Sequence, residues 1–472
     1  MKKFLNDKGI LNIILGFSLA SWISALINFA VLPVSTRYFE PSELAKINLF
    51  FIICTVILPL VSLGLDQGYM RFFHESKTRQ AKKELFYSCL FTGIIVLIIS
   101  TAVAFPFRKN ISVWITNEEN NFILISLFLC ILNMLVLRYF SLLHRMNNSI
   151  ILFTATSIFS LPVLKVSSLV AALYDSKYYT AIIFIAITSF VTLLMTFLLS
   201  KSNISRISIT RTIKVDILRF SLPLMPITVI ALLNNNIPLF LIRTLDNMSN
   251  LGIYSTAVTL VGIITLLQSG LNMFWSPYVY KRYEQESSIL NIRKIQKFVV
   301  FAMVAFSILI IMFQDLIILL LGEEYRIAVS FIPFLLVSPV CYTVAETTGI
   351  GIALKKKSYI NLYIYLVNIF INVLFCYLLI PYFGLQGAAI SSAISSISML
   401  ILKTYFGQKY YKSMGRYKDV IVGMSILIIV TIINVIIFNE YIHIFINLIA
   451  LIFMVKFFGI VNILRSIIRN QK

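Results

Sequence analysis

Long apolar segments separated by short polar ones run along almost the whole chain. Most are roughly 16–25 residues long, and about 20 helical residues cross the hydrocarbon core of a bilayer. The segments lie at 13–32, 47–65, 87–107, 122–142, 150–173, 179–200, 220–242, 252–276, 298–321, 327–349, 359–380, 385–402, 420–438 and 441–463. This pattern predicts an all-α polytopic membrane protein with about 14 transmembrane helices.

The first apolar segment follows Met-Lys-Lys, as the apolar region of a signal peptide does. It extends from Ile10 to Pro33, which is longer than the 7–15 apolar residues of a signal peptide. We therefore predict that it is retained as a membrane helix.

Composition supports the bilayer as the solvent of this chain. Of the 472 residues, 59% are hydrophobic and only 12% are charged, about half the charged fraction of an ordinary soluble protein. The five cysteines lie within or beside apolar segments and include no C-x-x-C pair. We interpret them as packing residues, with no disulfide, metal site or cofactor implied.

The net charge of +21 is explained by orientation rather than by nucleic acid binding. With the N-terminus inside, about three quarters of the lysines and arginines fall in alternate segments that become cytoplasmic, as the positive-inside rule requires. This pattern predicts an even number of spans and both termini in the cytoplasm. A nucleic acid partner is not expected.

The short loops exclude several functions. The longest, at 66–86, 200–219 and 277–297, leave no room for a soluble catalytic domain. No Gly-Lys dipeptide occurs, so a P-loop ATPase is excluded, and neither a zinc-protease motif nor a serine-hydrolase motif is present. We expect a transporter driven by an ion gradient or a potential, and no enzyme.

Two pairs of residues indicate an internal repeat. Gly64 and Gly270 are each followed by Leu and lie 206 residues apart, the same offset that separates Arg37 from Arg243. Matched spacing predicts two parallel six-helix halves. The expected division is a bundle at 1–214, a second bundle at 215–412, and two additional helices at 413–472.

Motifs at recurring points of the first twelve spans resemble those of the polysaccharide and O-antigen (Wzx-type) flippases of the multidrug/oligosaccharidyl-lipid/polysaccharide (MOP) exporter superfamily. They are Pro33 to Ala45, Gly64 to Arg71, Phe220-Ser-Leu-Pro-Leu-Met-Pro226, Gly252-Ile-Tyr-Ser-Thr-Ala257, Leu321-Gly-Glu-Glu-Tyr325 and Ile380-Pro-Tyr-Phe-Gly-Leu-Gln-Gly-Ala-Ala-Ile390. The chain departs from the family in its seventh span, where Asn234-Asn-Asn-Ile-Pro238 replaces a common Asp-Arg pair.

The resemblance implies a flippase that moves an undecaprenyl-pyrophosphate-linked oligosaccharide, such as an O-antigen repeat unit, across the bacterial inner membrane by alternating access. The headgroup would pass through a central cationic cavity. Implied partners are the lipid-linked glycan and the bilayer, with a polysaccharide polymerase and a chain-length regulator as candidate protein partners. Alternatives are a peptidoglycan-precursor flippase, a multidrug exporter, and a membrane-embedded enzyme of glycan assembly.

Lys165 is the foremost candidate for substrate binding, because a charge in mid-membrane costs about 2.5–3.5 kcal/mol on the insertion scale. Pro162 and the nearby serines are typical of a helix that lines a wet cavity. Alternatively, the lysine reaches the outer interface by snorkelling, since Leu173 is eight residues away, or ~12 Å along a helix.

Five further residues are candidates for contact with the substrate. Arg37 and Arg243 lie at outer helix ends and Arg71 at an inner one, where phosphates enter or leave; the alternatives are interfacial anchoring and topology signalling. Asn235 and Asn236 interrupt the seventh span and should face the bundle interior, binding sugar hydroxyls, a cation or a neighbouring helix.

Asp66 and Glu346 are the acidic residues nearest to the membrane interior, each toward the inner end of its span. Either is a candidate site for proton or sodium coupling. The alternative is a salt bridge to a basic neighbour, which for Asp66 would be Arg71.

Overall fold

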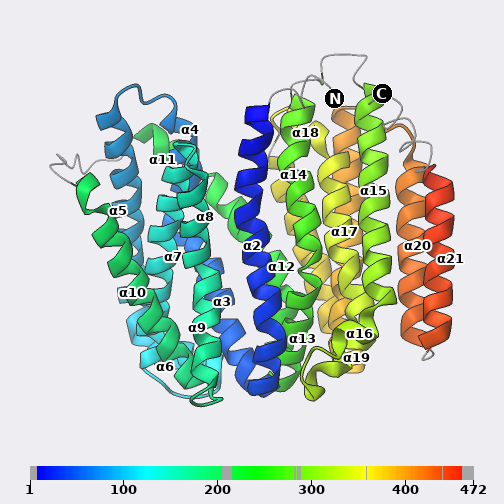
Figure 1. The fold of residues 1–472 in the computed structure, drawn as a ribbon, viewed down its shortest axis with the longest axis horizontal. Helices are drawn as coiled ribbons and strands as arrows, with labels where there is room; N and C mark the ends of the chain where they lie inside the picture. The colour runs from blue at the N-terminus through cyan, green and yellow to red at the C-terminus, as the bar shows by residue number, and fades with distance from the viewer. Residues whose placement is uncertain are drawn as a thin grey trace. The chain divides into compact units, whose positions relative to one another are not determined.

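The computed structural model describes residues 8–204, 215–280, 283, 289–357, 359–437 and 440–459. All regular elements of these residues are helical (Figure 1). The chain divides into two compact units, Met1–Asn236 and Ile237–Lys472. Two predictions fall on residues that the structure does not describe. They are the boundary after residue 214 and the end of the last predicted span, at 460–463.

The part of the first unit that the structure describes is built from ten complete α-helices, one 3₁₀ turn and the start of α12. The elements are α2 (Lys8–Tyr38), α3 (Pro41–Ser62), α4 (Leu65–Phe73), α5 (Arg79–Ala104), η1 (Phe105–Phe107), α6 (Arg108–Thr116), α7 (Phe122–Met146), α8 (Ile150–Phe159), α9 (Leu161–Ala172), α10 (Tyr178–Ile204), α11 (Val215–Ser221) and α12 (Leu224–Leu245). Helix α7 packs against α3, α5, α8 and α10 and forms the centre of this unit.

The second unit follows from the end of α12. Its elements are α13 (Met248–Val261), α14 (Ile264–Tyr280), α15 (Ile289–Met312), α16 (Gln314–Ile318), η3 (Glu323–Ser330), α17 (Ile332–Thr348), α18 (Ile350–Leu354), α19 (Tyr359–Tyr410), α20 (Tyr417–Ile436) and α21 (Glu440–Phe458). Helix α17 packs against α15, α19 and α20, and the last two helices pack on α15.

The predicted spans agree well with these helices. Among the described residues, 11 helices are long and apolar enough to cross a membrane, or up to 13 if each of two bent pairs forms one span. Helix α19, 52 residues long, covers the eleventh and twelfth predicted spans and is broken by Gly384, whose φ of 53° and ψ of −128° are not helical. The polytopic all-α fold is confirmed, while the count of fourteen stays a prediction.

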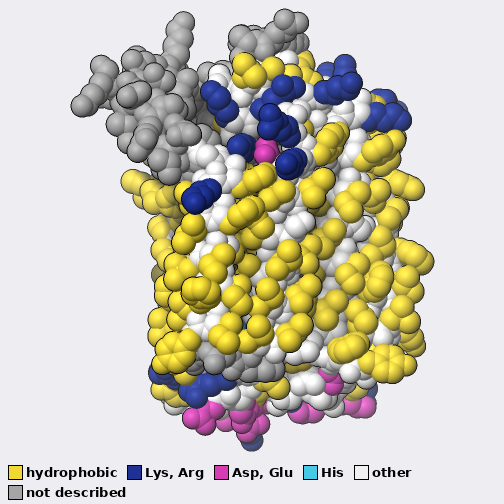
Figure 2. Space-filling model, turned by 90° about the vertical axis from the view of Figure 1, so that its right-hand side faces the viewer, with side chains coloured by type: hydrophobic (Ala, Val, Ile, Leu, Met, Phe, Trp, Pro, Cys, Tyr) yellow, Lys and Arg dark blue, Asp and Glu magenta, His cyan; other side chains and the backbone are white. Residues whose placement is uncertain are grey.

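Side chains on the face drawn in Figure 2 are sorted as a membrane requires. A broad apolar belt separates one rim rich in Lys and Arg from an opposite rim where Asp and Glu gather. Apolar side chains such as Ile429, Phe445 and Phe453 are more than half exposed. In water this surface would be unfavourable, whereas lipid tails satisfy it.

Gly64 allows two helices of the first unit to meet at close range. Helix α3 ends at Ser62 and is followed by Leu63 and Gly64, both in the left-handed region with φ of 50° and 67°. A Cβ on Gly64 would lie 2.6 Å from the backbone oxygen of Ser221 in α11. Only glycine combines this backbone conformation with so close an approach, which explains the Gly-Leu break at the end of the second predicted span.

Candidate functional site

An ion pair inside the second unit joins the two helices that pack most tightly there. Lys403 of α19 donates to the carboxylate of Glu346 in α17. The helices approach closely because Gly349 and Gly407 face each other: a Cβ on Gly407 would lie 2.5 Å from the Cα of Gly349. Glycine pairs permit this contact between membrane helices, and the contact brings the two charged side chains together.

The two members of this ion pair differ in exposure. The side chain of Lys403 is 7% exposed, whereas that of Glu346 is 32% exposed. The Lys403 ammonium also lies 5.6 Å from the ring centre of Tyr342 and 5.9 Å from that of Tyr365, within the range of cation–π attraction. The cation is therefore enclosed by rings and by one carboxylate, and this carboxylate is more exposed than the cation that it binds.

Uncharged polar groups complete the surroundings of this pair toward the basic end of the helices. The hydroxyls of Thr348 and Thr404 lie 2.7 Å apart. The amide of Gln408 donates to the backbone oxygen of Thr348 at 2.7 Å, and that of Gln296 to the backbone oxygen of Thr347 at 3.0 Å. These contacts bind α15, α17 and α19 together, so the helix backbones that carry Glu346 and Lys403 are held in place.

A second acid–base pair lies in the first unit. Arg138 of α7 donates to Asp66 of α4 at 3.0 Å, with side chains 46% and 16% exposed. The predicted salt bridge between Asp66 and Arg71 is wrong. Arg71 instead pairs with Glu75, just after α4, at 3.5 Å. Asp66 and Arg71 lie on one short helix, but Arg71 is an exposed side chain of its last turn, whereas Asp66 in its first turn meets α7.

Lys165 lies in the middle of α9, half-buried, where α9 packs against α2 and α10. Its backbone oxygen accepts from Ser168 at 2.7 Å. Among the described residues, no carboxylate forms an ion pair with its ammonium. The position predicted from the sequence as cavity-lining thus holds a half-buried cation with no ion-pair partner among the described residues of this unit.

The remaining predicted residues differ in their surroundings. Arg37 is exposed in the last turn of α2, and Arg243 is half-buried in the last turn of α12. Asn235 of α12 is exposed, and Asn236 donates its amide to the backbone oxygen of Leu232 at 2.8 Å. The Asn236 amide therefore has a partner within its own helix, as polar side chains in membrane helices often do.

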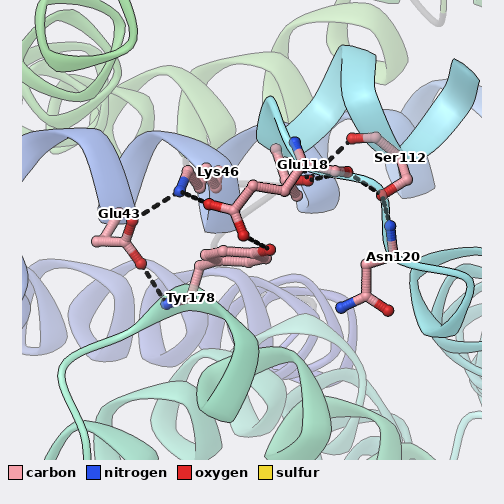
Figure 3. A network of polar contacts seen from close by, with 7 residues as sticks. Glu43, Lys46, Ser112, Glu118, Asn120 and Tyr178 are labelled. Carbon is pink, nitrogen blue, oxygen red and sulfur yellow. Dashed lines mark hydrogen bonds and ion pairs between the residues drawn. The ribbon is translucent and has the colours of Figure 1, made fainter. Parts of the chain in front are cut away.

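A polar cluster at the opposite end of the first unit was not predicted from the sequence (Figure 3). Lys46 of α3 binds Glu43 at 2.7 Å and Glu118 at 3.0 Å, and lies 4.3 Å from the ring centre of Tyr178. Tyr178 donates its hydroxyl to Glu118 and its backbone N–H to Glu43, both at 2.7 Å. The cluster joins the start of α3, the 117–121 loop and the start of α10.

The electrostatics of this cluster favour an ionised Glu118. The hydrogen bond from the Tyr178 hydroxyl, and then the bond and charge of Lys46, lower the pKa of Glu118 below its ordinary value. Ser112 of α6 fixes the loop further, donating to the backbone oxygen of Glu118 at 2.6 Å. We interpret the cluster as a clasp between three segments rather than as a ligand site, because its charged groups satisfy one another.

The apolar belt, the helical fold and the charges paired inside it define a polytopic α-helical membrane protein. The model of the family described as "Polysaccharide biosynthesis protein" matches residues 34–330. The chain belongs to this family.

A relative and two solved structures extend this assignment. The chain is 24% identical over 422 residues to the capsular polysaccharide biosynthesis protein CapF of Staphylococcus aureus, covering 83% of this chain and 98% of CapF. Its fold is similar to that of the lipid II flippase MurJ in an inward closed conformation, with a TM-score of 0.69, 15% identity, and coverage of 95% of this chain and 99% of MurJ. An inward-facing MATE multidrug transporter of the MOP superfamily gives a TM-score of 0.60 at 16% identity, covering 82% and 94%. The predicted relation to polysaccharide proteins is confirmed by the family, and the fold is similar to those of a lipid flippase and of a MOP-superfamily transporter.

Lys403 is the main residue that sequence reasoning missed. It follows the twelfth predicted span directly, in a group with Lys409 and Lys412, and the positive-inside rule accounts for such a group without further function. The structure continues α19 to Tyr410, so that Lys403 is buried inside the helix pair. Lys403 and Gly407 are one helical turn apart and so lie on the same face of α19. This spacing indicates a buried lysine only once the close packing at Gly407 is known.

Proposed function

We propose that this protein is a flippase for a lipid-linked oligosaccharide and that it moves an undecaprenyl-pyrophosphate-linked repeat unit of a surface polysaccharide across the bacterial inner (plasma) membrane. Membership of the polysaccharide biosynthesis family carries the proposal. The fold shared with a lipid flippase and with MOP transporters supports it. An O-antigen unit and a capsular unit are both compatible with this chemistry, and the name of the relative CapF concerns capsular polysaccharide.

The mechanism follows from the chemistry of such a substrate. A pyrophosphate with attached sugars is too polar to cross the hydrocarbon core unaided, so the protein must replace its hydration with fixed polar groups. In the proposed alternating-access cycle, the two six-helix halves expose this headgroup to one side at a time. The lipid tail stays in the bilayer throughout.

Lys165 is the proposed contact for the pyrophosphate in mid-membrane. Its half-buried ammonium, without a countercharge among the described residues of its unit, would gain a partner when the headgroup arrives. Arg71 and Arg37 lie on exposed surfaces at opposite predicted sides, where we propose they attract the phosphates on entry and release, with Arg243. Asn235 and Asn236 are proposed to meet sugar hydroxyls.

Ion coupling is proposed at the two paired carboxylates. Asp66 and Glu346 each hold a basic partner inside a helix pair, and proton or sodium binding would compete with that partner. The orientation with both termini in the cytoplasm rests on the predicted distribution of basic residues. A polysaccharide polymerase and a chain-length regulator remain the proposed protein partners.

Deletion of the gene in its own host tests this function. We expect loss of the surface polysaccharide and accumulation of its lipid-linked repeat unit in the cytoplasmic leaflet, with normal cell-wall synthesis and unchanged drug sensitivity. Arrested cell-wall synthesis would instead indicate a peptidoglycan-precursor flippase, the activity named for the structurally similar MurJ. Intact surface glycan with raised drug or dye accumulation would indicate an exporter, and absence of the assembled repeat unit would indicate an enzyme of glycan assembly.

A further inference from the structure

The ammonium of Lys403 is a buried cation, and the carboxylate bound to it is only half-buried. Glu346 binds it from α17, while Tyr342 and Tyr365 cover it with their rings. Because Glu346 is 32% exposed and Lys403 only 7%, an anion that approaches from the open side meets Glu346 first. The carboxylate occupies the position that an anionic ligand of Lys403 would take.

Packing alone does not explain this arrangement. Apolar side chains of similar volume usually fill a helix interface at least as well as a buried ion pair, because both charges of the pair lose their hydration. The Gly349–Gly407 contact and the threonine and glutamine bonds already hold α17 and α19 together. An ionisable pair inside a membrane protein is therefore a functional hypothesis with a named partner.

We propose that Lys403 binds a phosphate oxygen of the lipid-linked substrate near the inner side of the membrane, and that Glu346 is the exchangeable lid of this site. This inference rests on the proposed function and adds Lys403 to it as a binding residue. When the phosphate arrives, Glu346 swings toward its open side and takes up one proton from water. The ammonium keeps its own protons and exchanges a carboxylate for a phosphate, so no unpaired charge is left buried.

The proton balance of the exchange sets its pH dependence. In the free protein the Glu346 carboxylate binds the Lys403 ammonium; in the complex it would lose this cation and lie beside an anion, which favours the protonated form of any carboxyl group. The complex binds more protons than the free protein, and binding therefore strengthens as the pH falls. Over the range in which Glu346 takes up its proton, the slope approaches about tenfold per pH unit.

The other titratable groups near the pair do not produce this effect. Tyr280 of α14 and Tyr342 of α17 interact electrostatically with Glu346, and Tyr365 of α19 interacts with Lys403. The uncharged Gln296 of α15 binds the backbone oxygen of Thr347, the residue after Glu346. Phenols ordinarily ionise near pH 10, so the tyrosines do not supply a proton exchange at acidic to neutral pH.

Binding of farnesyl pyrophosphate to the purified full-length protein in detergent, measured across pH 5–8, tests the exchange. The wild-type protein should bind more weakly as the pH rises, and calorimetry in buffers of different ionisation enthalpy should show uptake of about one proton. Glu346→Gln should still bind the probe. Its affinity should depend on pH little more than the ionisation of the probe itself requires. Lys403→Met and the double variant Glu346→Gln/Lys403→Met should bind at least about tenfold more weakly, and Lys403→Arg should restore binding.

Lys456→Gln is the matched control, since it removes an exposed lysine near the end of α21 and should bind like the wild type. The exchange is refuted if the probe binds the wild-type protein but the double variant binds it equally well, or if Glu346→Gln keeps the full pH slope. The same pH-linked binding with phosphatidylglycerol as the probe would overturn the assignment to the glycan carrier. Failure of the wild-type protein to bind farnesyl pyrophosphate at any pH would count against the proposed substrate itself.

Discussion

Gly407→Ala tests how the helix pair of the second unit is held together. Gly407 lies one turn after Lys403 in α19, and its α-carbon faces the backbone of Gly349 at the end of α17. A Cβ at position 407 would lie 2.5 Å from the Cα of Gly349 and 2.6 Å from the backbone oxygen of Thr348. These neighbours are backbone atoms, so no side-chain rotation relieves the clash.

The expected loss of stability follows from how much closer the new Cβ would lie to its neighbours than an ordinary contact allows. Ordinary contacts of a Cβ begin at 3.4 Å, so the two backbones must separate by about 0.9 Å at this point, a displacement of the size that makes overpacking destabilising. We expect Gly407→Ala to lower the free energy of unfolding by about 1–3 kcal/mol. Because the separation also pulls Lys403 from Glu346, the cost should lie toward the upper end of this range.

Unfolding in mixed SDS and non-ionic detergent micelles, followed by tryptophan fluorescence, measures this change. Trp275 lies in a buried cluster of the second unit with Ile350 and reports on the affected region. Gly93→Ala is the control: the nearest atoms to its Cβ would be side-chain atoms of Leu135, the methyl groups at 3.1 and 3.2 Å, so a small shift of one side chain rather than of a backbone relieves the contact. Equal stability of the two variants would refute the argument that backbone contact at Gly407 determines the packing.

Three further changes test separate parts of the account. Lys165→Ala should reduce transport several-fold with an unchanged yield of folded protein, because the headgroup loses its cationic contact; wild-type transport would remove Lys165 from the site. Tyr178→Phe should lower the free energy of unfolding by about 1 kcal/mol, a value discounted for the exposure of Glu118. The pKa of Glu118 is lowered in the folded protein, so this stabilisation is present above the ordinary carboxylate range and should disappear as the pH falls through the lowered pKa. A stability difference that persists in strong acid would contradict this reasoning. Asn434 and Asn447 exchange two hydrogen bonds of 3.2 Å between α20 and α21; unfolding measurements should show that Asn434→Leu alone costs about 1–3 kcal/mol, and the double leucine variant less than the sum of the single ones.

The fold was predictable because membrane helices satisfy two simple requirements, length and apolarity. Each predicted span overlaps a helix or a helix pair of the described residues, and the eleventh and twelfth spans share α19. Helix breaks were harder to predict: α8 and α9 are separated at Ser160, within the fifth predicted span. Local backbone geometry depends on the neighbours that satisfy the freed polar groups, and the apolar pattern carries no information about them.

The candidate site was predicted less completely, because partners are a property of tertiary structure. Glu346 was identified from its depth in the span, yet its partner Lys403 was assigned to a loop, since a lysine at the end of a span satisfies the positive-inside rule equally well. Asp66 was given a near neighbour in sequence, Arg71, and instead binds Arg138, 72 residues away. Lys46, an outer basic residue in the sequence, proved to be the centre of a cluster drawn from three segments.

The central claim is that this protein carries a lipid-linked oligosaccharide across a membrane. Its most direct test is reconstitution of the purified protein into liposomes that contain a fluorescent undecaprenyl-pyrophosphate oligosaccharide, with a membrane-impermeant reagent to count the molecules in the outer leaflet. We predict that the protein makes the inner-leaflet pool accessible to the reagent, and that Lys165→Ala slows this exchange. Exchange no faster than in protein-free liposomes, under an imposed proton or sodium gradient as well as without one, would contradict the account.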